Sequence, residues 1–396
     1  MFEAHFPARI VYGEDSIRFL GSIDAKRVFI LADEIFHKYN TKLFDNLDEM
    51  FKEKGTVSQL HFGEGGEPSL DFVKRASAAM TSFQPDLVVA IGGGSTLDSA
   101  KVMEVYYEHP GITDAEISNR FHLPPIRRKA KLAAVPTTSG SGSEATPIAV
   151  MYVQSDNPDI PHVKRGIADY QLIPDWVILD PAFSLTMPKS VTASTGLDAF
   201  VHAMEAYVSN KPKSTFGDDF AIKAMQKVMT NLPLVLAEPK NMAYRSEMQL
   251  AATMGGLALA NRASGCSHAV GKQLATLCPI SHGISVAMML PQVIQANASV
   301  RLAEYVEIAH ALGSRARSEQ NALKDLISMV KNLLRAAGCP RTLADIRLDK
   351  DKFFDNLDLL VRNSQADAAM KGNPRPLTND EVRAIFLSLT PPDQAD

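Results

Sequence analysis

The chain has 396 residues, of which 45% are hydrophobic and 22% are charged, a balance typical of one or two globular domains and not of a disordered protein. Its formal net charge of -4 is spread without a long run of either sign, which argues against a nucleic-acid surface and a polybasic membrane patch. Chemistry on small molecules is the class of function that remains.

The first part of the chain predicts a doubly wound α/β domain. Nearly continuous apolar, β-branched runs indicate buried parallel strands at residues 27–33, 86–95, 131–138 and 176–181. Residues 69–83 have the apolar spacing of a helix. Strands that alternate with helices are typical of a parallel sheet covered on both faces.

The pattern changes after Pro188, which interrupts it. The rest of the chain has few β-branched runs and many periodic stretches rich in Ala, Leu and Met, which predicts helices throughout. We therefore expect an α/β domain over residues 1–186 and a helical domain over residues 187–396.

The cysteines and the N-terminus indicate a reducing compartment. Cys266, Cys278 and Cys339 are odd in number and have no C-x-x-C spacing, so neither a disulfide framework nor a cysteine zinc site is expected. The opening MFEAHFPARIVYGEDS has no basic segment before an apolar core, and no window approaches the roughly 20 apolar residues of a membrane span. These features predict a soluble, cytoplasmic protein.

A glycine-rich turn, AIGGGSTLDSAK at residues 90–101, leads from a predicted strand into a predicted helix. Glycines let backbone amides approach a phosphate closely, and the start of a helix adds partial positive charge. The run lacks the G-x-G-x-x-G spacing, and glycine-rich turns also serve purely conformational ends. Phosphate binding and a conformational role both stay open for this turn alone.

A second loop, PTTSGSGSEAT at residues 136–146, also follows a predicted strand and is rich in hydroxyls. Flexible surface loops share this composition. Open α/β sheets, however, bind ligands at the carboxyl ends of their strands, where both loops fall. Two such loops at one edge predict a dinucleotide site.

Asp33 ends the strand predicted at residues 27–33. An acid there can accept hydrogen bonds from an adenosine ribose and repels a 2′-phosphate, which favours NAD over NADP. The same residue is also a suitable N-cap for the segment that follows. Both interpretations stay open.

Asp198 and His202 are spaced i, i+4 in GLDAFVHAMEAY, so both lie on one helix face, at a spacing that lets two side chains ligate one metal. A buried hydrogen bond between them is the simpler explanation of the pair alone. His268, in a helical pattern, and His282, in a turn, add two further imidazoles. Three imidazoles and a carboxylate suit a divalent metal such as Fe(II) or Zn(II).

With these residues assembled, the chain resembles the iron-containing, metal-dependent alcohol dehydrogenase family over nearly its whole length. The resemblance is carried by the ordered motifs FPARIVYG, AIGGGSTLDSAK, PTTSGSGSEAT, HVKRGI, LDPAFSLTMP, TGLDAFVHAMEAYVS and SHGISVAMMLP. It implies an N-terminal dinucleotide-binding domain, a helical metal-binding domain, and an active site in the cleft between them.

The resemblance also implies ligands and roles. The metal, most often Fe(II), is expected on Asp198, His202, His268 and His282. Contacts to NAD(H) are expected from Asp33, Gly93, Gly94, Ser95, Asp98, Thr137, Thr138, Ser141 and Lys164. The implied reaction is hydride transfer between the nicotinamide and a small alcohol or aldehyde held at the metal. Homodimers are common in the family, so a homodimer is expected.

The chain departs from the family beside the third expected ligand. Many members read H-x-x-x-H there, whereas this chain has Lys272 four residues after His268, and Arg262 occupies a position where small apolar residues are common. One hypothesis is that Lys272, with Arg262, binds a carboxylate, sulfonate or phosphonate tail of the substrate. Lys272 could instead act as a catalytic proton donor, or point to solvent.

Two other kinds of function are compatible with the same motifs: a related enzyme with another substrate, or a protein without catalytic activity. Glycerol dehydrogenase-like and dehydroquinate synthase-like enzymes share the two-domain plan, although PTTSGSGSE and the four ligands fit the alcohol dehydrogenases better. A non-catalytic protein, in which the metal only holds helices together, would have a closed site and no activity on aldehydes.

Overall fold

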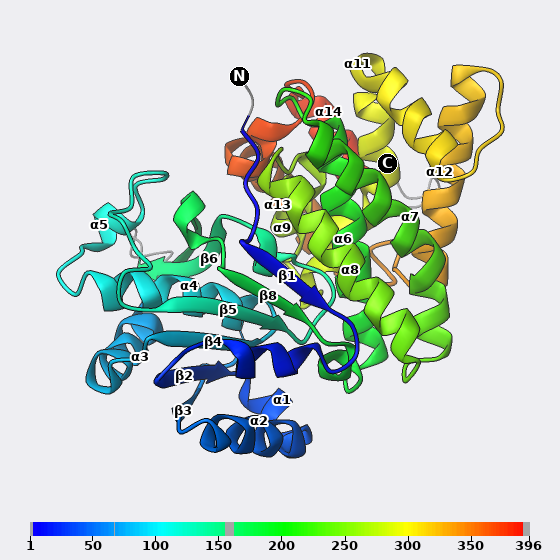
Figure 1. Ribbon diagram of the computed structural model, residues 1–396. Helices are drawn as coiled ribbons and strands as arrows, with labels where there is room; N and C mark the ends of the chain where they lie inside the picture. Colours follow the sequence, from blue (N-terminus) through cyan, green and yellow to red (C-terminus); the bar gives the residue numbers. More distant parts are fainter. Residues whose placement is uncertain (1–2, 67, 155–161, 391–396) are drawn as a thin grey trace.

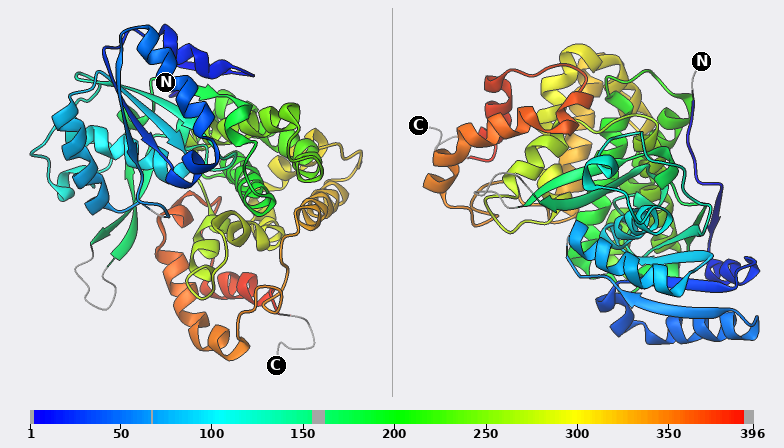
Figure 2. Two further views of the ribbon diagram at one scale, coloured as in Figure 1. Left: turned by 90° about the horizontal axis from the view of Figure 1, so that it is seen from below. Right: turned by 90° about the vertical axis from the view of Figure 1, so that its left-hand side faces the viewer.

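The structure is a computed structural model that describes residues 3–66, 68–154 and 162–390. One part of the molecule contains the strands and the other consists of helices (Figures 1 and 2). Among the described residues, no helix combines the length and the apolar character needed to cross a membrane.

Six parallel strands form the main sheet, in the order β1-β8-β5-β4-β2-β3. The strands are β1 (Arg9–Tyr12), β2 (Arg27–Ala32), β3 (Val57–Phe62), β4 (Leu87–Gly92), β5 (Lys131–Pro136) and β8 (Trp176–Leu179). The four strands expected from the sequence are confirmed as β2, β4, β5 and β8. β1 and β3, at the two edges of the sheet, were not expected, because both are only partly buried.

Helices cover both faces of this sheet, as the pattern of buried residues requires. Val28 and Ile30 of β2 pack in one apolar cluster with Phe44 of α2, whereas Phe29 of the same strand packs in another with Val73 of α3. Because successive side chains of a strand point to opposite faces, a strand buried on both sides is apolar at every position. The α/β domain is therefore doubly wound.

The helices of the α/β domain are α1 (Glu34–Tyr39), α2 (Thr41–Glu53), α3 (Leu70–Phe83), α4 (Gly94–Glu108) and α5 (Asp114–Ile117). Short 3₁₀ turns in this part of the chain are η1 (Ser16–Ser22), η2 (Ser143–Ala145), η3 (Tyr170–Leu172) and η4 (Pro181–Ser184). The expected helix at residues 69–83 is confirmed as α3.

The second part of the chain is helical, as expected, and packs around one large apolar core. Its helices are α6 (Lys189–Val208), α7 (Thr215–Ala237), α8 (Met242–Ala260), α9 (Cys266–Leu274), α10 (His282–Met288), α11 (Leu290–Ala311), α12 (Glu319–Ala336), α13 (Lys350–Ala366) and α14 (Asn379–Leu387). A 3₁₀ turn, η5 (Ala368–Gly372), lies between α13 and α14.

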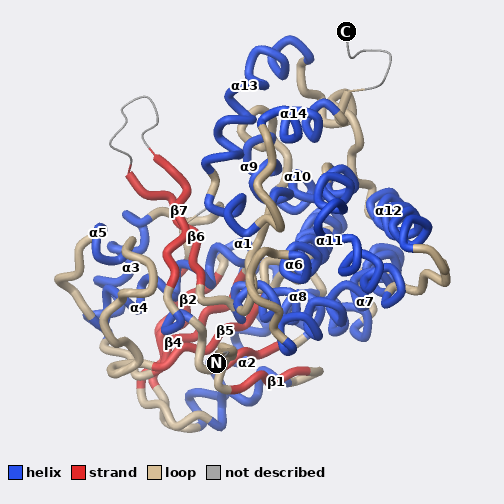
Figure 3. Tube along the Cα trace, turned by 90° about the horizontal axis from the view of Figure 1, so that it is seen from above, coloured by secondary structure: helices blue, strands red, loops and turns tan. Residues whose placement is uncertain are grey.

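A separate antiparallel hairpin, β6 (Ile148–Gln154) and β7 (His162–Ala168), extends away from the main sheet (Figure 3). It contains the HVKRGI motif and places Lys164 opposite Tyr152. A hairpin was not expected here from the sequence.

The segment between the two domains is fastened to the helical one. Arg245 of α8 is fully buried and donates hydrogen bonds to the carbonyls of Met187 and Pro239 and to the hydroxyl of Thr192. Lys240 donates to the carbonyl of Leu185 at 2.9 Å. These acceptors satisfy the N–H donors of the buried guanidinium. The hydrogen bonds therefore hold the segment between the two domains against α8.

The hydroxyl-rich loop touches the helical domain through backbone atoms. A Cβ added at Gly256 of α8 would lie 2.4 Å from the carbonyl oxygen of Gly142, and one added at Gly140 would lie 2.5 Å from the Thr195 side chain of α6. Gly142 also has a φ of +63°, in the left-handed region that favours glycine. These contacts fix the loop against α6 and α8.

We predict that Gly256→Ala separates these surfaces and lowers the free energy of unfolding by about 1–3 kcal/mol, because the new methyl group overpacks against backbone atoms that cannot rotate away. Gly111→Ala is the control, since a Cβ there meets nothing within 4 Å. Urea denaturation of both variants measures the difference, and equal stabilities would contradict the tight contact.

Candidate active site

Three imidazole nitrogens face one buried carboxylate oxygen. The Nε2 atoms of His268, His282 and His202 lie 3.6, 3.7 and 3.9 Å from Oδ1 of Asp198. Within the described part of the chain, Asp198, His268 and His282 are grouped with their donor atoms all within 4.8 Å of one another. Three of the four side chains expected as ligands therefore form one group, and His202 lies next to it, with its Nε2 3.9 Å from Oδ1 of Asp198.

Three helices supply these side chains. α6 supplies Asp198 and His202 one turn apart, α9 supplies His268, and His282 is the first residue of α10. A Cβ at Gly283 would lie 1.9 Å from the carbonyl oxygen of Ser194, so only glycine lets α10 pack this closely on α6. That close approach brings His282 to Asp198.

The donor atoms fit a divalent metal. Oδ1 of Asp198 and Nε2 of His268 are both buried without a hydrogen-bond partner, which is unusual for polar atoms unless an ion binds them. Ligands about 2.1 Å from a tetrahedral ion are about 3.4 Å apart, close to the separations found here. Three imidazoles and one carboxylate suit Fe(II) or Zn(II).

Burial and the neighbouring charges shift the pKa values of the four side chains. Burial raises the pKa of Asp198, but the facing histidines outweigh it and hold that pKa below its usual range. Burial, with the positive charges of His268 and Lys164, lowers the pKa of His282 to about 3 despite the opposing effect of Asp198. Burial also lowers the pKa of His202. The two lowered rings favour the neutral form that ligates metals.

Glu205 contacts one of the expected ligands, although it was not among the site residues expected from the sequence. Its carboxylate lies 2.6 Å from Nδ1 of His268 and is itself buried. Burial lowers the pKa of His268, but Glu205 and Asp198 outweigh this and raise it to about 9. The signal was present, because Glu205 follows Asp198 by seven residues and His202 by three, on the same helix face.

The two loops expected to bind a dinucleotide lie side by side. β4 and β5 are neighbours, and the amide of Thr137 donates to the carbonyl of Gly92 at 2.9 Å. A Cβ on Gly93 would lie 3.4 Å from the Thr138 side chain, and one on Gly94 would lie 2.9 Å from the Ser141 hydroxyl. The loops therefore contact each other where they leave the carboxyl ends of β4 and β5.

The glycine-rich turn presents the start of α4. Gly93 is the N-cap of α4, so no side chain caps the first amides of the helix, and Gly94 and Ser95 are its first residues. All three positions are partly exposed. Free amides at the start of a long helix are well suited to a phosphate.

Asp98 lies beneath the loops. Its buried carboxylate accepts hydrogen bonds from the Ser143 hydroxyl and, at 2.8 Å, from the Val150 amide. The ammonium of Lys101, fully buried, lies 3.9 Å from Asp98 and donates to Ser143 and to the carbonyl of Thr146. The structure thus gives Asp98 a role in supporting the hydroxyl-rich loop, where the sequence analysis expected a cofactor contact.

Family descriptions match both domains in order. "Iron-containing alcohol dehydrogenase" matches residues 7–181, and "Fe-containing alcohol dehydrogenase family, C-terminal" matches residues 192–390. The chain belongs to the iron-containing alcohol dehydrogenase family. It is therefore a metal-dependent oxidoreductase that uses NAD(P) and acts on alcohols and aldehydes.

Individual alcohol dehydrogenases are similar to it over most of its length. The chain is 32% identical over 389 residues to an NADPH-dependent butanol dehydrogenase of Clostridium saccharobutylicum, covering 98% of this chain and 97% of that one. It is 34% identical to the bifunctional aldehyde-alcohol dehydrogenase AdhE of Escherichia coli K12, covering 91% of this chain but 43% of that longer one. An iron-containing alcohol dehydrogenase structure from Thermococcus thioreducens has a TM-score of 0.86 at 32% identity, covering 98% of this chain and 99% of that one.

Asp33 serves as an N-cap in this family member. One of its carboxylate oxygens accepts a hydrogen bond from the Phe36 amide at 2.7 Å, at the start of α1. Asp33 directly follows β2, which pairs with β4 on one side. Capping by one oxygen leaves the second available, so the capping role and the expected ribose contact are compatible.

Lys272 and Arg262 were both expected to bind an anionic substrate tail, but Lys272 is partly exposed whereas Arg262 is buried. Lys272 lies one turn after His268 on α9, and its ammonium pairs with both oxygens of Asp367 at 3.1 and 3.4 Å. Arg262 is buried and donates to the carbonyls of Ala206, Tyr207 and Pro212, so it satisfies the end of α6. The expected substrate contact of Arg262 is corrected accordingly, because its side chain is buried and faces these carbonyls and, at 3.5 Å, the carboxylate of Asp218.

Proposed function

We propose that the protein interconverts a short-chain alcohol and its aldehyde with Fe(II) and NAD(H). The observation that carries the proposal is the meeting of three imidazole nitrogens with the orphaned oxygen of Asp198. The glycine-rich turn and the hydroxyl-rich loop support the proposal that a dinucleotide binds, since they lie against each other at the carboxyl ends of β4 and β5.

The main contribution of the protein's own residues is to position the metal and the cofactor relative to each other. Asp198, His202, His268 and His282 would hold the metal, which supplies a Lewis acid for the substrate oxygen. The nicotinamide supplies or accepts the hydride. Gly140 packs on Thr195, three residues before Asp198 on α6, so one contact fixes the cofactor loop relative to the metal ligands. Fixed geometry between two reactants is itself a large part of catalysis.

We predict that the protein oxidises NADH with short aldehydes and that exhaustive chelation lowers the rate by at least about a hundredfold, since losing a Lewis acid costs several kcal/mol of transition-state stabilisation. Absorbance at 340 nm follows the reaction. Adding Fe(II) or Zn(II) back to the chelated protein, in separate arms, should restore the rate and rank the two metals.

Full activity after chelation would contradict the metal-dependent mechanism. Binding of metal without activity on any aldehyde would support a structural site instead. Faster oxidation of glycerol than of short primary alcohols would favour the glycerol dehydrogenase-like alternative.

We propose NAD(H) over NADP(H) because Asp33 places a carboxylate at the end of β2. A 2′-phosphate near this carboxylate is repelled, whereas ribose hydroxyls can donate to its uncapped oxygen. This preference would differ from that of the similar Clostridium enzyme, which is NADPH-dependent.

We predict that Asp33→Asn raises the ratio of kcat/KM for NADPH to that for NADH by about tenfold, because it removes like-charge repulsion of roughly 1.4 kcal/mol. Asparagine caps helices as well as aspartate does, so stability should stay unchanged. Steady-state kinetics with both cofactors, and a thermal unfolding control, test this. An unchanged ratio in a stable variant would contradict the proposed preference.

An anionic tail on the substrate is the finer proposal, and it depends on Lys272 alone. The side chain keeps 33% of its surface exposed and lies one helical turn from His268. Asp367 is its present partner, so an anionic tail must share or replace that carboxylate. Removing Asp367 should therefore strengthen binding of an anion.

We predict that Lys272→Ala lowers kcat/KM for a carboxylate-bearing aldehyde by about ten- to a hundredfold, the value of a charged hydrogen bond, and changes a neutral aldehyde of equal length less than about twofold. Asp367→Asn should raise kcat/KM for the anionic aldehyde. Lys371→Ala, an exposed lysine of η5, is the control. Equal losses for both aldehydes in Lys272→Ala would exclude the tail contact.

A further inference from the structure

We infer that Glu205 is a positioning residue that orients His268 and fixes the start of α9 before the metal binds, and so sets the affinity of the site for its metal. The inference rests on the proposed function, because it concerns the same metal site. Glu205 contacts one of the four expected ligands, His268, and none of its described hydrogen bonds reaches the two cofactor loops.

The contact with His268 decides which ring nitrogen faces the metal. Oε2 of Glu205 lies 2.6 Å from Nδ1 of His268, while Nε2 of the same ring lies 3.6 Å from Asp198. A carboxylate at Nδ1 keeps the proton there, which leaves the Nε2 lone pair for a metal. The carboxylate also makes the ring a stronger ligand.

The same carboxylate caps α9. It accepts hydrogen bonds from the amides of Gly265 at 2.8 Å and Ser267 at 2.6 Å, and a longer one from His268 at 3.4 Å. Gly265, the N-cap residue, has no side chain that could do this. Glu205 thus replaces the missing cap from another helix, and the helix it caps is the one that carries His268.

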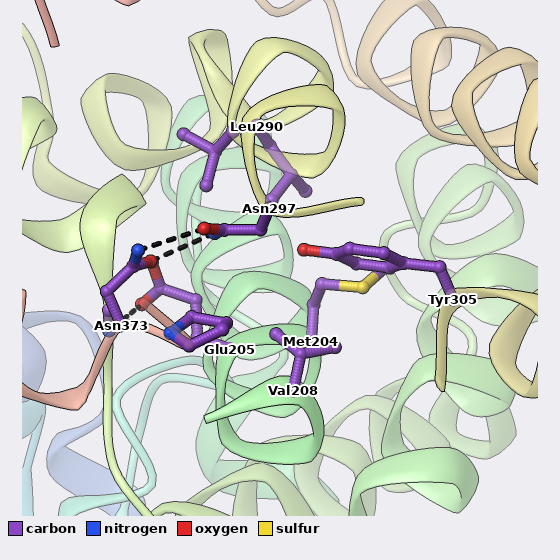
Figure 4. A pocket seen from close by; sticks show the side chains of 10 residues that line it. Met204, Glu205, Val208, Leu290, Asn297, Tyr305 and Asn373 are labelled. Atoms are coloured by element: carbon purple, nitrogen blue, oxygen red, sulfur yellow. Dashed lines mark hydrogen bonds between the residues drawn. The ribbon is translucent and has the colours of Figure 1, made fainter. Parts of the chain in front are cut away.

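The surroundings prevent Glu205 from rotating away. Asn373 lies beside it and exchanges two hydrogen bonds of 2.9 Å with Asn297, and it also accepts one from the Cys266 amide (Figure 4). The cavity next to these side chains, which Tyr305 also lines, measures about 10 Å³, room for one water at most. The carboxylate therefore has little free space beside it.

The pattern of donors makes the charge of Glu205 essential. N–H groups point at both of its oxygens, from Gly265 and His268 at Oε2 and from Ser267 at Oε1. A glutamine has the same shape, but its NH₂ group would face one of these donors whichever way it is turned. Glu205→Gln therefore weakens either the hold on His268 or the cap of α9.

Zn(II) affinity of the purified protein, measured by competition with a chromophoric chelator, tests the inference without relying on activity. We expect Glu205→Gln to bind Zn(II) about 10- to 100-fold more weakly than the wild type, the usual effect of removing such a partner. Glu144→Gln is the matched control, since Glu144 is equally buried but bonds to Thr253. Its Zn(II) affinity should equal that of the wild type.

Co(II) in place of Zn(II) supplies a spectroscopic readout that a purely structural role would leave unmoved. We expect the visible absorption bands of Co(II) to change in Glu205→Gln, as the His268 ligand is misplaced, and to stay unchanged in Glu144→Gln. Wild-type affinity and spectrum in a folded Glu205→Gln protein would overturn the inference. Equal loss of affinity in both variants would also overturn it.

If Glu205→Gln does not fold, Glu205→Asp carries the test, because it keeps the charge and retracts the carboxylate from His268 by about 1.5 Å. We expect at least about tenfold weaker Zn(II) binding, and wild-type affinity would overturn the inference. Comparing the Zn(II) affinity of His268→Ala with that of the wild type tests the metal site independently of Glu205. A wild type whose Zn(II) affinity does not depend on His268 would contradict the proposed metal site itself.

Discussion

A buried negative charge organises this molecule. Asp198 lies in the interior of the helical domain, where an isolated carboxylate is costly, and it keeps its charge because three imidazoles face it. Those rings come from α6, α9 and α10, so the three helices must pack closely enough to bring them together. Glycines at positions 271 and 283 make that packing feasible, since a side chain at either would collide with a neighbouring backbone.

The division of work between the domains follows from their architectures. Parallel strands end at one edge of a sheet, and this edge supplies backbone amides for a phosphate. A helix bundle instead presents side chains from several directions to one interior point, which suits a metal. Catalysis needs both, and the contact of Gly140 with Thr195, three residues before Asp198 on α6, joins them.

Local chemistry explains what the sequence predicted well. The strands predicted at residues 27–33 and 86–95 have continuous apolar runs, VFILA in β2 and LVVAI in β4, because helices cover both faces of the sheet, and such runs are hard to mistake. The spacing of Asp198 and His202 likewise follows from helical geometry alone. The edge strands carry weaker signals, because β1 has only 4 residues and β3 mixes apolar and polar residues. The apolar run of β6 was present in the sequence, but its antiparallel partner β7 was not recognisable from an apolar run of its own.

The roles of single charged residues depended on contacts between distant segments. Glu205 and His268 are 63 positions apart, and Lys272 and Asp367 are 95 apart, so spacing could not reveal either pair. Arg262 was assigned to the pocket wall from its position in a motif, whereas its three carbonyl partners belong to the end of α6 and the loop after it. The role of a charged side chain such as Arg262 cannot be assigned from the sequence until the groups that accept its hydrogen bonds are known.

The backbone contact between Gly142 and Gly256 has a consequence for recombining such enzymes. The two glycines belong to different domains, yet each excludes a side chain on the other. A chimera that takes its cofactor domain from one relative and its metal domain from another inherits one half of this contact from each parent. The residue pair at these positions is therefore a compatibility condition for domain exchange, separate from overall sequence similarity.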